Sequence, residues 1–232
     1  MDIPLLKKIH RRVRALREVR WRDAAQKFLR ILSVKPYTMV EYPRLASMYD
    51  VMLESERFND VEGAIVEAGS WNGGYALLMG MISDACGKKR HVWLFDSFEG
   101  LPAPSAVDRN RRGFLAKKGA AGDASETTVA KAFCAFDQTR VHVVKGWFEH
   151  TFDETLPKVG PIAYIHLDAD LYEPTKYCLE QLWPLLSRGG IIFFDDYSYY
   201  EGCKKAVDEF LAKHTIGGLV RSVDETAYVR KV

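Results

Sequence analysis

Two pairs of carboxylates follow neighbouring apolar runs in the second half of the chain. Asp168 and Asp170 follow IHL, and Asp195 and Asp196 follow IIFF. Four carboxylates at adjacent strand ends would repel one another in a low-dielectric cleft unless a positive charge lies among them. Oxygen ligands without a Cys cluster or a spaced His pair favour Mg²⁺ or a similar hard cation. The alternative is that one or two of these residues cap the helices that follow, which accounts for Asp196 alone but poorly for all four.

Two turns earlier in the chain have the residue types of a nucleoside-binding site. The stretch VEAGSWNGG places Glu67, Gly69 and Ser70 after one apolar run, where glycine lets a ligand approach the backbone. Because a carboxylate precedes the first glycine, the turn suits an ammonium group or hydroxyls better than a pyrophosphate. The stretch FDSFEGLP places Asp96 and Ser97 after the next run. An acidic residue there can accept hydrogen bonds from ribose hydroxyls, and the alternative is a turn or helix-capping role.

Five short apolar runs must position these side chains. They cover residues 64–66, 92–95, 141–144, 162–167 and 190–194, and helical patterns at 75–85 and 175–186 lie between them. Nearly continuous apolar strands in alternation with helices predict an α/β fold, with a doubly wound, mostly parallel sheet and helices on both faces. Residues 219–223 and 227–232 can add a closing antiparallel pair. Ligands of such sheets bind beyond the carboxyl ends of the strands.

The chain of 232 residues suits one domain with appendages. We interpret residues 1–60 as an N-terminal helical arm or cap and residues 61–232 as the catalytic domain. Residues 1–30 contain ten Lys and Arg against three acidic residues, and apolar residues recur there at helical spacing: Leu6, Ile9, Val13, Leu16 and Val19. Further helices are predicted at 23–32 and 43–58. We expect the apolar stripe to pack on the chain's own body or on a second subunit in a homo-oligomer, rather than on a membrane surface.

Composition excludes several other classes of protein. A net charge of +2 gives no basic excess for a nucleic-acid partner, and no apolar run reaches the length of a transmembrane segment. Four widely spaced cysteines support neither a disulfide framework nor a zinc site, so we expect a reduced, cytoplasmic protein. The polar segment 102–128 interrupts the alternation of strands and helices, which indicates either a functional lid or a disordered loop.

These motifs give the chain a specific resemblance. It resembles the macrocin O-methyltransferase family, whose members use S-adenosylmethionine and Mg²⁺ to methylate sugar hydroxyls. Over about residues 38–210 the matching stretches are, in family order, TM, VEAGSWNGG, FDSFEGLP, KGWFEHTF, LDADLYEPT and GGIIFFDDYSYYEGCKKAVDEF. Ala169 stands where family members commonly have glycine. The resemblance implies a class I methyltransferase (Rossmann-like) fold and, as the acceptor, a hydroxyl of a sugar or glycosylated natural product.

The resemblance also implies a role for each candidate residue. Asp168, Asp195 and Asp196 would be metal ligands, and Asp170 would be the general base. Glu67, Gly69 and Ser70 would meet the methionine moiety of the cofactor, and Asp96, followed by Ser97, would meet its ribose. Gly146, Trp147 and Phe148 would flank the adenine, although the two aromatic residues can equally belong to the core. His166 is a reserve candidate for the base, whereas His142 and His150 are interpreted as structural.

Two other functions stay open from the residues alone. A D-x-D sequence after a strand can hold Mg²⁺ against a nucleotide sugar, as in a metal-dependent glycosyltransferase, but that function gives Glu67 and Asp96 no task. A non-catalytic subunit with a methyltransferase fold is the other alternative. The four clustered carboxylates argue against it, because a site without catalysis has no reason to concentrate repelling charges.

Overall fold

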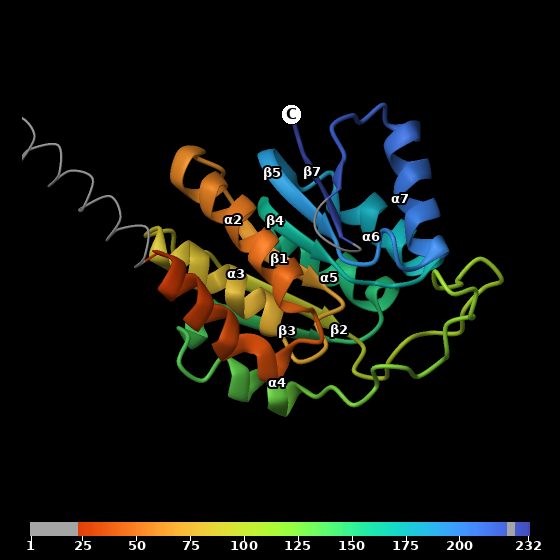
Figure 1. The fold of residues 1–232 in the computed structure, drawn as a ribbon, viewed down its shortest axis with the longest axis horizontal. Helices are drawn as coiled ribbons and strands as arrows, with labels where there is room; N and C mark the ends of the chain where they lie inside the picture. Colours follow the sequence, from red (N-terminus) through yellow and green to blue (C-terminus); the bar gives the residue numbers. More distant parts are fainter. Residues whose placement is uncertain (1–22, 222–225) are drawn as a thin grey trace, which may run out of the picture.

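The computed structural model describes residues 23–221 and 226–232, and within them it contains a seven-stranded sheet. The strands are β1 (Ala64–Ala68), β2 (Val92–Asp96), β3 (Val141–Lys145), β4 (Ile162–Leu167), β5 (Leu186–Phe194), β6 (Val220–Arg221) and β7 (Ala227–Arg230). Their order is β3-β2-β1-β4-β5-β7-β6 (Figure 1). The first five strands are parallel, and β7 is antiparallel to both β5 and β6. The mostly parallel sheet and the closing antiparallel pair are therefore confirmed.

Helices cover both faces of the sheet (Figure 1). The helices are α2 (Tyr42–Phe58), α3 (Gly74–Ala85), α4 (Glu126–Ala132), α5 (Phe148–Val159), α6 (Tyr172–Leu182) and α7 (Glu201–Lys213), with short 3₁₀ turns at Lys35–Tyr37 and Gln138–Arg140. Met52, Leu78 and Val129 join α2, α3 and α4 to one apolar core. Phe152, Leu179 and Val207 join α5, α6 and α7 to a second core on the opposite face. Because every residue of β1 and β4 is buried, their near-continuous apolar sequences follow from contact with both layers.

The register of the central strands brings the functional motifs to one edge. Glu67 of β1 lies beside His166 of β4, and His166 lies beside Phe193 of β5. The chain leaves β4 through Asp168 and leaves β5 through Asp195, so both carboxylates emerge at the carboxyl edge of the sheet. This is the edge at which ligands of open α/β sheets bind.

The N-terminal part of the described chain packs against the sheet domain. Residues 23–34 form a helix, as predicted for 23–32, and α2 confirms the helix predicted at 43–58. Met52 of α2 shares a core with Leu78 of α3, so this region covers one helical layer of the domain. The amphipathic pattern at residues 6–19 lies outside the described residues. Within the described part, no helix has the length and apolar character needed to span a bilayer.

Candidate active site

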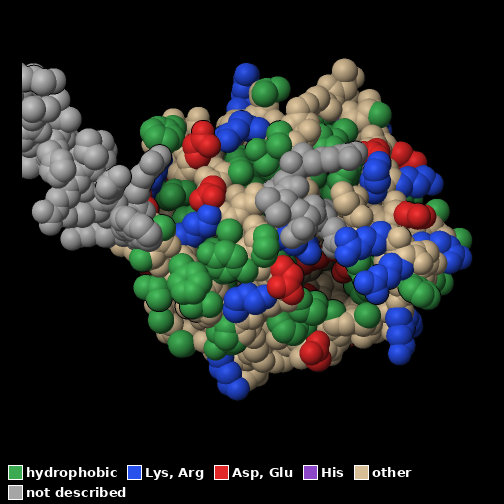
Figure 2. Space-filling model, viewed as in Figure 1, with side chains coloured by type: hydrophobic (Ala, Val, Ile, Leu, Met, Phe, Trp, Pro, Cys, Tyr) green, Lys and Arg blue, Asp and Glu red, His purple; other side chains and the backbone are tan. Residues whose placement is uncertain are grey.

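A cavity of 660 Å³ lies at the carboxyl edge of the sheet. Every candidate site residue from the sequence lines it: Glu67, Gly69, Ser70, Asp96, Ser97, Gly146, Trp147, Phe148, Asp168, Asp170, Asp195 and Asp196. In the space-filling view a hollow with acidic side chains in its wall opens near the centre of the face (Figure 2). The fold therefore joins motifs that lie as much as 129 residues apart in the sequence in one site.

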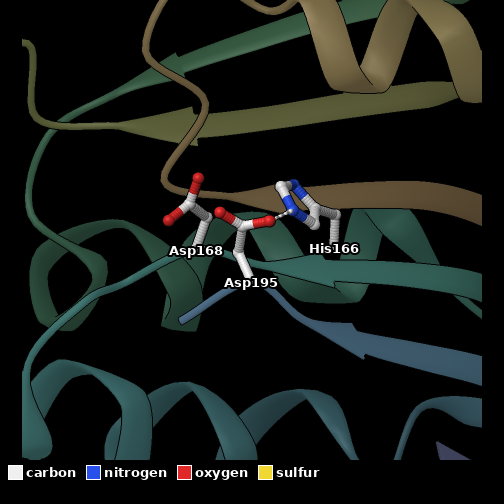
Figure 3. Close-up of side chains that lie close together, drawn as sticks. All are labelled: His166, Asp168 and Asp195. Atoms are coloured by element: carbon white, nitrogen blue, oxygen red, sulfur yellow. Dashed lines mark ion pairs between the residues drawn. The ribbon is translucent and has the colours of Figure 1, made fainter. Parts of the chain in front are cut away.

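The four aspartates form two overlapping clusters. Asp168 offers a ligand atom within 4.8 Å of those of His166 and Asp195, and it does the same with Asp170 and Asp196. The side chains of His166, Asp168 and Asp195 converge from the ends of β4 and β5 (Figure 3). Oxygen donors dominate this set, which is the chemistry that Mg²⁺ prefers.

The electrostatics of the cluster indicate a shortage of positive charge. Burial, together with the charges of neighbouring aspartates, raises the pKa of Asp168 and of Asp170 well above the ordinary value. The same causes raise the pKa of Asp196 to about 6. Asp195 alone has a lowered pKa, because His166 and Arg44 outweigh its burial. The nearby protein cations do not neutralise all of the negative charge of the cluster. The residues present therefore fit a bound divalent cation.

Unpaired polar atoms give a second indication that a ligand belongs here. The Oδ1 atom of Asp195 and the Nε2 atom of His166 are buried, lie 3.5 Å apart and have no hydrogen-bond partner among the described residues. The Oγ atom of Ser70 is likewise buried without a partner in the described structure, and Ser70 lines the cavity. Buried polar atoms normally have partners, so these three fit a site completed by ligands.

His166 bridges the first strand and the carboxylate cluster. Its Nδ1 atom lies 2.9 Å from Oε1 of Glu67, and its ring stacks on Tyr75 with a centroid distance of 3.4 Å. Although burial opposes a charge on His166, the neighbouring carboxylates of Asp195 and Glu67 raise its pKa. Glu67 also accepts a hydrogen bond from the backbone N–H of Ala76 at 3.3 Å, and burial raises the pKa of its carboxyl. These contacts fix His166 in place between two carboxylates.

Asp96, at the end of β2, connects the turn after β1 with the turn after β2. Its Oδ2 atom accepts hydrogen bonds from the backbone N–H groups of Ser70 at 2.9 Å and Trp71 at 2.8 Å. Its Oδ1 atom accepts one from the N–H of Phe98 at 2.7 Å. The turn role considered from the sequence is thus present, and the carboxylate also lines the cavity. A contact with ribose stays a prediction.

The segment after β3 contributes one glycine and two aromatic residues to the cavity. The N–H of Gly146 donates to the carbonyl of Asp96 at 2.9 Å, which ties this turn to the end of β2. Trp147 precedes the first residue of α5, which is Phe148, and both side chains are half-buried. Phe148 packs on Phe152 with a centroid distance of 5.4 Å. Phe148 therefore belongs partly to the core while it also borders the site.

Residues 102–125 form an anchored loop that lines part of the cavity, and we call this loop the lid. Asp108 is 1% exposed and accepts hydrogen bonds from Ser105 and from the backbone N–H of Tyr172 at the start of α6. Asn110 forms a β-bridge with Tyr200, before α7. At the other end Asp123 accepts a hydrogen bond from the indole of Trp71 at 2.9 Å. Of the two interpretations left open by the sequence, these anchors favour an ordered lid.

Arg44 and Tyr75 are site residues that the sequence did not reveal. Arg44 lies in the first turn of α2 and forms an ion pair with Asp195, 151 residues away. The only signal for it is indirect: four carboxylates require positive charge, and a basic residue of the N-terminal cap can supply part of it. His142 instead stacks on Trp93 with a centroid distance of 4.0 Å, in agreement with its structural interpretation.

The strand order and the location of the cavity define a class I methyltransferase fold. The O-methyltransferase from Bacillus cereus, solved in complex with SAH, shares this fold with a TM-score of 0.53 at 14% identity over 89% of this chain and 91% of that one. The structure of the O-methyltransferase NovP is more similar, with a TM-score of 0.73 and 32% identity over 84% of this chain and 82% of that one.

Sequence comparison identifies the family. The model of the macrocin-O-methyltransferase (TylF) family matches residues 10–231. A demethyldecarbamoylnovobiocin O-methyltransferase from Streptomyces niveus is 32% identical over 220 residues, which cover 93% of this chain and 83% of the relative. The 8-demethyl-8-(2,3-dimethoxy-alpha-L-rhamnosyl)-tetracenomycin-C 4'-O-methyltransferase from Streptomyces olivaceus is 35% identical over 199 residues, 82% of this chain and 73% of the relative. The chain belongs to the macrocin O-methyltransferase family.

Proposed function

We propose that this protein transfers a methyl group from S-adenosylmethionine to a hydroxyl of a sugar or glycosylated natural product, with Mg²⁺ bound at the aspartate cluster. The observation that carries the proposal is the shared cavity, in which the turns after β1 and β2 face the carboxylates after β4 and β5. Membership of an O-methyltransferase family supports methyl transfer to a hydroxyl as the reaction in this cavity.

Residues of the first two turns would hold the cofactor. Ser70 offers a buried hydroxyl without a partner in the described structure, and Glu67 offers a carboxylate suited to an ammonium group. Asp96 accepts three backbone hydrogen bonds, and a carboxylate has about four acceptor positions, so one remains for a ribose hydroxyl. Trp147 and Phe148 would border the adenine. When bound, S-adenosylmethionine supplies an electrophilic methyl group next to the acceptor oxygen.

Residues after β4 and β5 would hold the cation and remove the proton. Asp168, Asp195 and Asp196 are the proposed ligands. When bound, Mg²⁺ supplies positive charge that lowers the pKa of the acceptor hydroxyl. Asp170 lies in the same cluster and would accept the proton as the acceptor oxygen forms its bond to the methyl carbon. Placing the two reactants in line is the remaining contribution of the cavity, and such positioning supplies about 7–11 kcal/mol in favourable cases.

The names of relatives support a glycosylated acceptor. Alongside the novobiocin and tetracenomycin enzymes, a mycinamicin III 3''-O-methyltransferase from Micromonospora griseorubida is 30% identical over 199 residues, 81% of this chain and 75% of the relative. Each of these names specifies O-methylation of a natural product. The lid borders the cavity and contains none of the sequence motifs that match the family. We expect this segment to select the acceptor.

Titration calorimetry with S-adenosylmethionine and, separately, UDP-glucose tests the proposal. Each ligand is added with and without Mg²⁺. Micromolar binding of S-adenosylmethionine, followed by chelator-sensitive methylation of a sugar acceptor, is the expected result. Mg²⁺-dependent binding of UDP-glucose alone would favour the glycosyltransferase alternative. Binding of S-adenosylmethionine without turnover on any glycoside would favour the non-catalytic subunit.

We also propose that the protein self-associates through its N-terminal region, with residues 1–60 acting as a cap on the catalytic domain. Phe28, Leu29, Leu32 and Met39 are exposed by 47–63%. Hydrophobic side chains gather on the lower left of the face in Figure 2, where the first described helix lies in Figure 1. Light scattering coupled to size-exclusion chromatography tests this: a monomer at micromolar concentration would contradict it.

A further inference from the structure

The cavity has a strongly unequal charge. Among the described residues that line it, nine are Asp or Glu, and Arg44 is the one Lys or Arg. The Arg44 side chain is 11% exposed and that of Asp195 is 6% exposed, so this ion pair is shielded from solvent. A single guanidinium therefore acts on a carboxylate cluster in surroundings where charges interact strongly.

Arg44 contacts one carboxylate oxygen of Asp195 and leaves the other toward His166. Its Nη2 atom donates to Oδ2 of Asp195 and to the backbone carbonyl of the same residue, the latter at 3.1 Å. The Oδ1 atom of Asp195 lies 3.5 Å from Nε2 of His166, and Asp195 offers one carboxylate oxygen to the cluster with His166 and Asp168. Arg44 thus contacts a proposed metal ligand directly through Oδ2, while Oδ1 faces His166.

We propose that Arg44 is a built-in counter-ion that weakens divalent-cation binding at the aspartate cluster and keeps the cluster assembled whether or not a cation is bound. This inference rests on the proposed function, because it assumes that a cation binds there. The guanidinium draws electron density from Asp195 and repels a second positive charge a few ångströms away. It also offsets part of the repulsion among four carboxylates, which no other Lys or Arg lining the described cavity does.

The substitution Arg44→Gln separates charge from hydrogen bonding. Glutamine retains an amide N–H that can donate toward Asp195 but carries no charge. Mn²⁺ is a spectroscopically convenient substitute for Mg²⁺. We expect the R44Q protein to bind Mn²⁺ at least about tenfold more tightly than the wild type does. Arg44→Lys is the matched control, because it retains the positive charge, and its affinity is expected within about threefold of the wild type.

The experiment measures Mn²⁺ binding to the full chain by calorimetry and by electron paramagnetic resonance, without cofactor or acceptor. Unchanged or weaker Mn²⁺ binding by folded R44Q protein would overturn the inference and leave the metal site itself intact. If the wild type binds no Mn²⁺, the metal part of the proposed function fails and the inference falls with it. Asp168→Asn provides the binding-deficient reference.

Thermal unfolding gives a readout that does not depend on catalysis. Without added cation the R44Q protein should melt below the wild type, because Asp195 loses its charged partner, and Mn²⁺ should raise its melting temperature by more than that of the wild type. If R44Q is unfolded without cation, recovery of its circular dichroism at Mn²⁺ concentrations below the wild-type Kd supports the inference. No recovery at any Mn²⁺ concentration would contradict it.

Discussion

Gly69 and Asp168 lie in direct backbone contact where β1 and β4 end. A Cβ atom added to Gly69 would stand 1.8 Å from the carbonyl oxygen of Asp168, and the glycine has a φ of +83°. The N–H of Asp168 donates to the carbonyl of Ala68 at 2.9 Å. The turn that we assign to the cofactor and the strand end that we assign to the cation are therefore one packed unit.

Gly69→Ala tests this contact. The new methyl group would clash with the Asp168 carbonyl, which is backbone and cannot rotate away, and alanine is disfavoured at positive φ. We expect a loss of about 3 kcal/mol or more in unfolding free energy, measured by urea denaturation. Gly113→Ala is the matched control, because Gly113 has a φ of +80° but nothing within 4 Å of its added Cβ, and about 1–2 kcal/mol is expected there. If both variants lost the same unfolding free energy, the close contact between Gly69 and the Asp168 carbonyl would not contribute to stability.

The sequence predicted the sheet, and the edge of the sheet at which the candidate residues meet, for a physical reason. Strands buried on both faces read as short apolar runs, and side chains that follow parallel strands must meet at one edge of the sheet. Glu67, Asp96, Asp168 and Asp195 each follow an apolar run, and all four line the cavity. Their roles in binding and catalysis stay predictions.

The contacts between these residues could not be predicted in the same way. Arg44 reaches Asp195 because the first turn of α2 lies next to the end of β5, a tertiary arrangement with no signature in local spacing. The three backbone hydrogen bonds to Asp96 depend on the path of two turns, and the lid is anchored by contacts with distant elements, among them those of buried Asp108. The spacing of apolar residues indicates which helices and strands form. The pairing of side chains from distant elements can be determined only from the three-dimensional structure.

Asp170→Asn tests the proposed base. The amide has nearly the same shape as the carboxyl but cannot accept a proton, so we expect methyl transfer to fall by about 10²–10⁴-fold. Binding of S-adenosylmethionine, measured by calorimetry, should stay within a few fold of the wild type, because Asp170 lies in the cluster after β4 and not in the cofactor turns. Turnover close to that of the wild type would exclude Asp170 as the base and leave His166 as the reserve candidate.

Asp108→Ala tests the lid. Its carboxylate holds Ser105 and the N–H of Tyr172 at 2.7 and 2.8 Å, so the substitution leaves buried donors unsatisfied and should cost about 1–3 kcal/mol. We expect faster proteolysis within residues 102–125 and a higher KM for the acceptor, with little change in cofactor affinity. Lys118→Ala, at an exposed lid position, is the control and should change none of these. An unchanged cleavage pattern in the Asp108 variant would contradict the anchoring role.

The stability of the protein in a chelator should fall as the pH rises from about 5 to 8. Asp196 has a pKa raised from 3.8 to about 6 in the folded state, so the fold favours its protonated form. That contribution is complete below about pH 4 and is lost as the pH rises through 6. The raised pKa of His166 acts in the same direction, because its protonated form is favoured by the fold until the pH passes its folded-state value. The lowered pKa of Asp195 matters only in acid, below this window.

Mg²⁺ should reverse this trend, because a cation binds deprotonated carboxylates and compensates the charge that destabilises the fold. We therefore expect Mg²⁺ to raise the melting temperature more at pH 8 than at pH 5, measured by calorimetry in matched buffers. Asp196→Asn is the control: without an ionisable group at this position, the fall in chelator between pH 5 and pH 8 should be smaller. An equal Mg²⁺ effect at both pH values would mean that the cation does not bind at the titrating carboxylates, and the metal site would then have to lie elsewhere.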